Sequence, residues 1–152
     1  MTDERQPADV VTHLVEQVLA RAATWTTWDG APRPIDDRVY TPHKAIRRTA
    51  DHLIDHLAEV EARLAGVPTI PDRWHASAIT TPADRAPFTE EDLAEATSRL
   101  TRLAQIWAVR LDSLSEERLD RAEPGAWTIR EIAEHLSSTY YADAVGELDT
   151  SS

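Results

Sequence analysis

Two histidines, His52 and His56, lie four residues apart in the segment TADHLIDHL (49–57). If this segment is helical, one turn separates them and both rings lie on the same side of the helix. Two imidazoles at this spacing can bind one divalent ion such as zinc, nickel, copper or iron. An open metal site requires a third ligand, which has to come from another segment.

His135 is the candidate for that third ligand, because it lies in a short internal repeat. The segment KAIRRTADHL (44–53) shares its Ile, Arg, Ala, His and Leu residues, in register, with WTIREIAEHL (127–136). His52 and His135 are equivalent in this alignment and flank the apolar stripes of two predicted helices. A pseudo-twofold relation between these helices would bring the three histidines together, with Thr139 at the margin of the cluster.

Three histidine ligands leave one position of a metal ion open for water or a substrate thiol. An ion lowers the pKa of the bound group, so a nucleophile forms near neutral pH. Asp51, Asp55 and Glu134 adjoin the histidines and are candidates to hydrogen-bond the rings from behind. The alternative is that the histidines are bystanders on solvated helix faces, because the H-x-x-x-H spacing is common in helices.

The composition excludes several function classes. With 16 basic and 27 acidic residues the formal charge is −11, so nucleic acid and anionic membranes would be repelled on average. The chain lacks an apolar run long enough to span a membrane, and residues 1–6 do not resemble an export signal, so we expect a cytoplasmic protein. Because there is no cysteine, a thiol in any reaction has to arrive on a small-molecule substrate.

Apolar residues recur every three or four positions in four segments, which predicts four amphipathic helices. The predicted helices cover about residues 8–28, 42–65, 89–114 and 129–145. Thr41 followed by proline, Thr89 followed by acidic residues, and Thr128 paired with Glu131 are typical helix N-termini. No strand is predicted, and a di-iron site is excluded because no glutamate lies three residues before any of the three histidines.

The connection Gly66–Phe88 is rich in proline and lacks periodicity, so we expect it to be long and without regular structure. It carries Trp74 and His75, which are candidates for a lid over the site; the alternative is that Trp74 only anchors the loop. We therefore predict one all-α domain over residues 1–152, with an ordered core from about 8 to 146 and a frayed end from Leu148. Its architecture would be a four-helix bundle with a long crossover connection between helices two and three.

WTIREIAEHL, preceded by the Pro124–Gly125 turn, resembles the motif of the DinB-like superfamily. Members of this superfamily are four-helix bundles with a divalent-metal site of three histidines. One histidine follows a Trp-Ser or Trp-Thr motif, a role that His135 matches, and two come from an H-x-x-x-H helix, as His52 and His56 do. The order of the two motifs along this chain is the reverse of the usual one, which a pseudo-symmetric bundle tolerates.

The resemblance implies a metal-activated thiol chemistry. Related proteins include transferases and isomerases that use mycothiol or bacillithiol, and the N-terminal domain of maleylpyruvate isomerase. The resemblance offers Thr139 and Tyr140 as substrate contacts. Independently of the resemblance, Trp74 and His75 on the long connection would contact the substrate as a lid, and exposed Trp and Tyr side chains would permit a homodimer. The alternative is a non-catalytic helical bundle that binds a small ligand or a protein partner without a metal.

Overall fold

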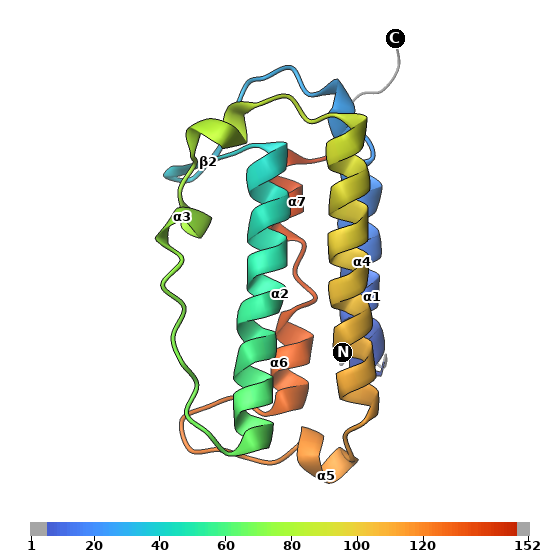
Figure 1. The fold of residues 1–152 in the computed structure, drawn as a ribbon, viewed down its shortest axis with the longest axis vertical. Coiled ribbons are helices and arrows are strands. Elements are labelled where there is room, and N and C mark those ends of the chain that lie inside the picture. The colour runs from blue at the N-terminus through green and yellow to red at the C-terminus, as the bar shows by residue number, and fades with distance from the viewer. Residues whose placement is uncertain (1–5, 149–152) are drawn as a thin grey trace.

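The computed structural model of the protein describes residues 6–148 and is built almost entirely of helices (Figure 1). The all-α prediction is therefore confirmed. The elements in chain order are α1 Pro7–Ala22, η1 Trp25–Thr27, β1 Arg33–Ile35, β2 Arg38–Tyr40, α2 Pro42–Ala65, α3 His75–Ala78, η2 Pro82–Arg85, α4 Glu90–Asp112, α5 Glu116–Leu119, α6 Ile129–His135 and α7 Tyr140–Val145. Here η denotes a short 3-10 helix.

The three long helices lie side by side, and α6 followed by α7 makes up a fourth column (Figure 1). α1 packs mainly against α4, and α2 packs against α7 and α4. α2 and α4 run in the same direction, because the connection after α2 returns along the outside of that helix (Figure 1). Trp107, Leu100 and Leu53 are fully buried in the core, together with Ile132 and Leu136 from the last column.

α2 carries two of the three histidines, and its ends are those that the sequence predicts. The Thr41 hydroxyl accepts a hydrogen bond from the Lys44 backbone N–H at 3.2 Å, and Pro42 occupies the first helical position. Gly66 ends the helix with a φ of 70°, a left-handed conformation that favours glycine. The two caps define where α2 begins and ends, so His52 and His56 lie within one continuous helix.

The prediction of one continuous helix over residues 129–145 is wrong. α6 ends at His135, where the Leu136 and Ser137 N–H groups turn back to the carbonyls three residues earlier. The following Ser137–Thr139 segment contains hydroxyl side chains that compete with the helix for backbone hydrogen bonds. The Ser138 hydroxyl accepts from the Tyr140 N–H at 3.3 Å, and a new helix begins at Tyr140.

Two other predicted boundaries are corrected near the start and end of the chain. The first helix ends at Ala22, not near residue 28, because Trp25 turns into the core and its indole N–H donates to the Gly146 carbonyl at 2.7 Å. Leu148, which we expected to be frayed, donates its N–H to the Thr24 hydroxyl at 2.9 Å. Residues 149–152, where the rest of that prediction falls, lie outside the described part of the chain.

A short antiparallel hairpin precedes α2, although no strand was predicted. β1 pairs with β2 across a turn in which Asp36 has a φ of 54°. Aspartate tolerates this left-handed conformation better than most residues, so the turn is local in origin. Strands of three residues are too short to leave an alternating pattern in the sequence, which explains the wrong prediction.

The connection after α2 is anchored to that helix and contains two short helical turns, so the prediction that it lacks structure is also corrected. The Arg47 guanidinium pairs with the buried Asp84 carboxylate and donates to the Ile79 carbonyl at 2.8 Å. The buried Lys44 ammonium donates to the Val39 carbonyl at 2.8 Å and to the Thr80 hydroxyl at 3.1 Å. These contacts hold the second half of the connection against the first two turns of α2.

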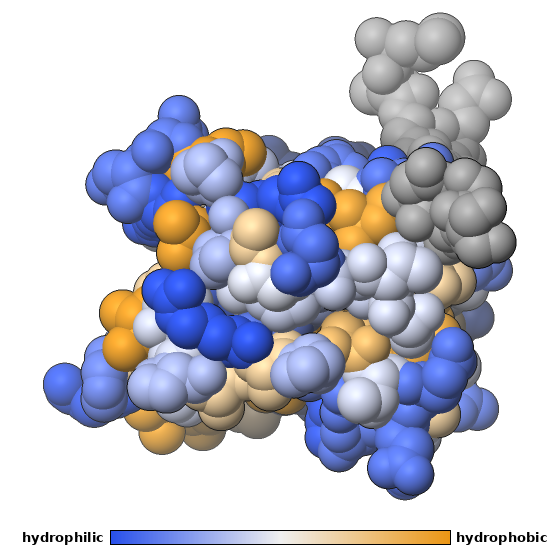
Figure 2. Space-filling model, turned by 90° about the horizontal axis from the view of Figure 1, so that it is seen from above, coloured by the Kyte–Doolittle hydropathy of each residue, from blue (hydrophilic) through white to orange (hydrophobic). Residues whose placement is uncertain are grey.

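Within residues 6–148, every helix is too short or too polar to cross a lipid bilayer. Figure 2 shows the end of the molecule at which α2 and α4 begin. In that view hydrophobic residues are scattered among polar ones and do not form a continuous apolar surface.

The capping box of α6 provides a test of how this short helix is held. The Thr128 hydroxyl accepts from the Glu131 N–H at 3.1 Å, and the Glu131 carboxylate accepts from the Thr128 N–H at 2.9 Å. We expect Thr128→Ala to lower the free energy of unfolding by about 1 kcal/mol, measured by urea denaturation. Thr101→Ala, an exposed mid-helix threonine of α4, should have little effect; equal losses in both variants would contradict the capping role.

Candidate metal centre

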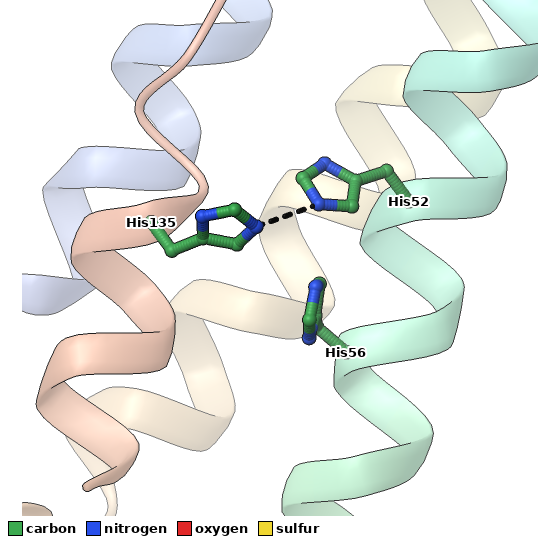
Figure 3. A group of neighbouring side chains, drawn as sticks. All are labelled: His52, His56 and His135. Carbon is green, nitrogen blue, oxygen red and sulfur yellow. Dashed lines mark hydrogen bonds between the residues drawn. The ribbon is translucent and has the colours of Figure 1, made fainter. Parts of the chain in front are cut away.

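His52, His56 and His135 converge on one point between α2 and the end of α6 (Figure 3). One nitrogen from each ring lies within 4.8 Å of those of the other two. The Nε2 atoms of His52 and His135 are 3.1 Å apart, and the ring centroids of the three pairs are separated by 4.8 to 5.1 Å. His52 and His135 are 83 positions apart in the chain, and the structure brings them together as the sequence predicts.

The donor set fits a tetrahedral divalent ion. Metal–nitrogen distances of 2.0 to 2.1 Å place two ligand nitrogens of a tetrahedral site about 3.3 Å apart. The His52–His135 nitrogen separation of 3.1 Å is close to this value, and a nitrogen of His56 lies within 4.8 Å of both. The three nitrogens leave the fourth position free, because the structure brings no other histidine, cysteine or carboxylate of residues 6–148 into the group.

Different local structures position the rings. His52 and His56 lie one turn apart on the continuous helix α2, whereas His135 is the last residue of α6. Trp127, the residue before the α6 cap, packs its ring against His135 with a centroid distance of 4.8 Å. The Trp127 carbonyl accepts a hydrogen bond from the Arg63 guanidinium, so α2 also fixes the segment that supports His135.

The environment of the cluster lowers the pKa of two of the rings, His52 and His135. Burial, together with the neighbouring rings of His56 and His135, lowers the pKa of His52 to about 4. Burial and His56 also lower the pKa of His135, while Glu59 opposes the shift. Neutral imidazoles have a free lone pair at neutral pH, which is the form that binds a metal.

One of the two facing Nε2 atoms of His52 and His135 donates a hydrogen bond to the other. This contact requires one ring to carry its proton on the nitrogen that faces the centre. An ion at the centre would replace that proton, and the ring would then keep its N–H on Nδ1. Metal binding would therefore exchange this hydrogen bond for coordination.

The carboxylate nearest to the rings is Glu59, which the sequence analysis did not single out. Its Oε2 atom lies 3.5 Å from Nδ1 of His56, but the buried Nδ1 atom has no hydrogen-bond partner in the described structure. Glu59 thus places a carboxylate near the site without hydrogen-bonding to His56. Asp51 and Asp55 line a cavity that borders His52, and Glu134 is exposed.

A cavity of about 180 Å³ adjoins His52 on one side of the histidine cluster. It lies between α2 and the connection that follows it. Its lining includes His52 and the half-exposed Trp74, so the structure brings these two predicted residues to one place. Its other lining residues are Arg48, Asp51, Asp55, Asp72, Ser77, Ala78 and Tyr141.

The remaining predicted substrate contacts lie apart from this cavity lining. The Thr139 hydroxyl donates to the Asp143 carboxylate at 2.7 Å, and the Tyr140 ring packs against Tyr40 and Tyr141. His75 is exposed at the start of α3. Their roles in substrate binding stay predictions.

Sequence reasoning missed Arg48 and Tyr141, which both border the site. Arg48 lies four residues before His52, so the same helical spacing that linked His52 to His56 would have found it. Tyr141 could not have been found in this way, because its direction depends on the break between α6 and α7.

No protein-family model matches this chain, and no curated protein and no solved structure is significantly similar to it.

The pKa shift of His52 predicts how the stability of the metal-free protein depends on pH. The unfolded chain binds a proton near pH 6.5, whereas the folded protein resists protonation until about pH 4. The folded state is therefore most stable above pH 6.5 and loses this contribution as the pH falls towards 4. We expect the melting temperature in a chelator to fall over this window, and His52→Gln to flatten the dependence.

The matched control is His75→Gln, which changes an exposed histidine outside the cluster. This variant should keep the pH dependence of the unchanged protein. A His52→Gln curve that runs parallel to the other two between pH 4 and 6.5 would contradict the prediction.

Proposed function

We propose that this chain binds one divalent metal ion through His52, His56 and His135 and uses it to activate a small thiol. The observation that carries the proposal is the convergence of three imidazole nitrogens within 4.8 Å of one another. Three neutral histidines and an open position are the usual ligand set of a catalytic zinc site. Burial and mutual repulsion lower the pKa of His52 and His135, so less free energy is needed to deprotonate these rings before a metal binds.

The bound ion would supply Lewis acidity, which lowers the pKa of a coordinated thiol so that the thiolate is present at neutral pH. The protein has no cysteine, so the thiol has to come from a small cosubstrate. The cavity beside His52 offers a place for the electrophile, and Trp74 provides an apolar wall for it. The reaction class is thus transfer or isomerisation that starts with thiolate attack.

We also propose that the chain is a DinB-like four-helix bundle with the two histidine motifs in reversed order. Support comes from the four helical columns, with His52 and His56 on one of them and His135 at the end of a helix that follows Trp127-Thr128. The rival function is a helical protein that binds a ligand or partner without a metal. A direct measurement of bound metal separates the two.

The first test is metal content. Protein purified without an affinity tag and incubated with zinc should retain about one ion per chain after gel filtration, measured by elemental analysis. Zinc should also raise the melting temperature by several degrees, because it binds the folded state only. His135→Ala should abolish retention and the thermal shift, since two ligands from one helix remain.

His75→Ala is the control for nonspecific binding by exposed histidines, and it should behave as the unchanged protein does. A metal-free unchanged protein whose melting temperature does not respond to zinc would overturn the proposed function. So would equal zinc retention by the His135→Ala variant.

The second test concerns the thiol. Cobalt in place of zinc makes the centre visible by absorption, and a thiolate that binds it adds a sulfur-to-cobalt charge-transfer band. We expect 2-mercaptoethanol to produce this band at neutral pH in the cobalt-loaded protein. A spectrum that remains unchanged up to millimolar thiol would contradict the thiol-activating role while leaving the metal site intact.

A further inference from the structure

The row of metal ligands on α2 continues one turn towards the N-terminus with Arg48. Residues 48, 52 and 56 are spaced by four, so they lie along one side of the helix. His135 faces the two histidines of this row, and Tyr141 of α7 faces Arg48. The metal centre and the Arg48–Tyr141 pair are thus neighbouring parts of one interface between α2 and the last column.

Several contacts fix the position of Tyr141. Its hydroxyl oxygen accepts a hydrogen bond from Nη2 of Arg48 at 3.0 Å, and the Arg48 guanidinium carbon lies 4.8 Å from its ring centroid. The Tyr141 ring stacks on the buried Tyr40 ring at 6.2 Å and stands perpendicular to the His52 ring at 5.9 Å. A side chain held on three sides presents its hydroxyl in a defined place.

The Tyr141 hydroxyl retains an unused donor hydrogen. A phenol both donates and accepts, and Arg48 uses only its acceptor capacity. Within residues 6–148, no acceptor receives the Tyr141 O–H. The other terminal nitrogen of the Arg48 guanidinium, Nη1, donates to the Ser77 hydroxyl at 3.2 Å and so also fixes the guanidinium. Tyr141, Arg48 and Ser77 all line the cavity that borders His52.

We propose that Tyr141 donates a hydrogen bond to a carbonyl oxygen of the substrate held beside the metal, and that Arg48 positions Tyr141 for this task. The inference rests on the proposed metal site and names a substrate class for it. A positive guanidinium behind the phenol oxygen strengthens the phenol as a donor, so the bond gains strength as negative charge develops on the substrate oxygen.

The proposed step is attack of the thiolate on the substrate carbonyl. The thiol proton leaves to solvent when the thiolate forms, and the sulfur lone pair then attacks the carbonyl carbon. A C–S bond forms, the C=O π pair moves to the oxygen, and that oxygen accepts the hydrogen bond from Tyr141. Asp51, Asp55 and Asp72 line the same cavity, so a substrate with several negative charges is disfavoured.

The test uses the full chain loaded with cobalt and the probe acetohydroxamate, which binds metals through oxygen. Its affinity is measured from the visible spectrum. Tyr141→Phe should weaken acetohydroxamate binding about 10-fold, the usual effect of one lost hydrogen bond to a charged group. Cobalt affinity itself should not change, because Tyr141 is not a ligand. Thr101→Ala, which removes an exposed hydroxyl of α4 outside the cavity, is the control and should bind the probe as the unchanged protein does.

The positioning role of Arg48 is tested by a double-mutant cycle. Arg48→Met should weaken probe binding when Tyr141 is present and should have no further effect in the Tyr141→Phe background. A merely structural role would lower the melting temperature of both backgrounds without this coupling. If Tyr141→Phe does not fold, the Arg48→Met variant alone provides the same readout.

The outcomes separate the two proposals. Cobalt binding with equal acetohydroxamate affinity in the unchanged protein and in Tyr141→Phe overturns this inference and leaves the proposed function standing. If the unchanged protein binds no cobalt, the proposed function fails and the inference fails with it.

Discussion

The centre of this structure is the packing of α2 against the column formed by α6 and α7, which forces three imidazole rings into one small volume. This crowding constrains protonation, because burial and the neighbouring rings lower the pKa of His52 to about 4. The facing Nε2 atoms of His52 and His135 share one hydrogen bond. The same constraint favours a divalent ion, which replaces a proton and is attracted by three lone pairs.

The break between α6 and α7 has two consequences for the site. It places His135 at the end of a helix, next to the aromatic ring of Trp127 and within reach of α2. It also starts α7 in a new direction, so that Tyr141 meets Arg48. A continuous helix over the same residues would present side chains at fixed intervals of 100° and could not set these two positions independently.

The connection after α2 forms the outer wall of the cavity. Its second half is fastened by Arg47 to Asp84, and by Lys44, whose pKa is lowered by burial and by the nearby Arg47. Its first half, including Trp74, is exposed. The residues of α2 therefore form one fixed side of the cavity, and α3 lies where the connection is anchored to that helix. Trp74 lines the cavity from the less constrained part of the connection.

The sequence by itself determined the helical class, the caps of α2 and α4, and the three histidines, because spacing on a helix and capping chemistry are local properties. The repeat that aligned His52 with His135 was sufficient to predict their meeting. The break at His135 and the pairing of Tyr141 with Arg48 were decided only by the tertiary structure. These features depend on which faces of distant helices meet and on hydroxyl groups competing for backbone hydrogen bonds, and neither leaves a periodic pattern in the chain.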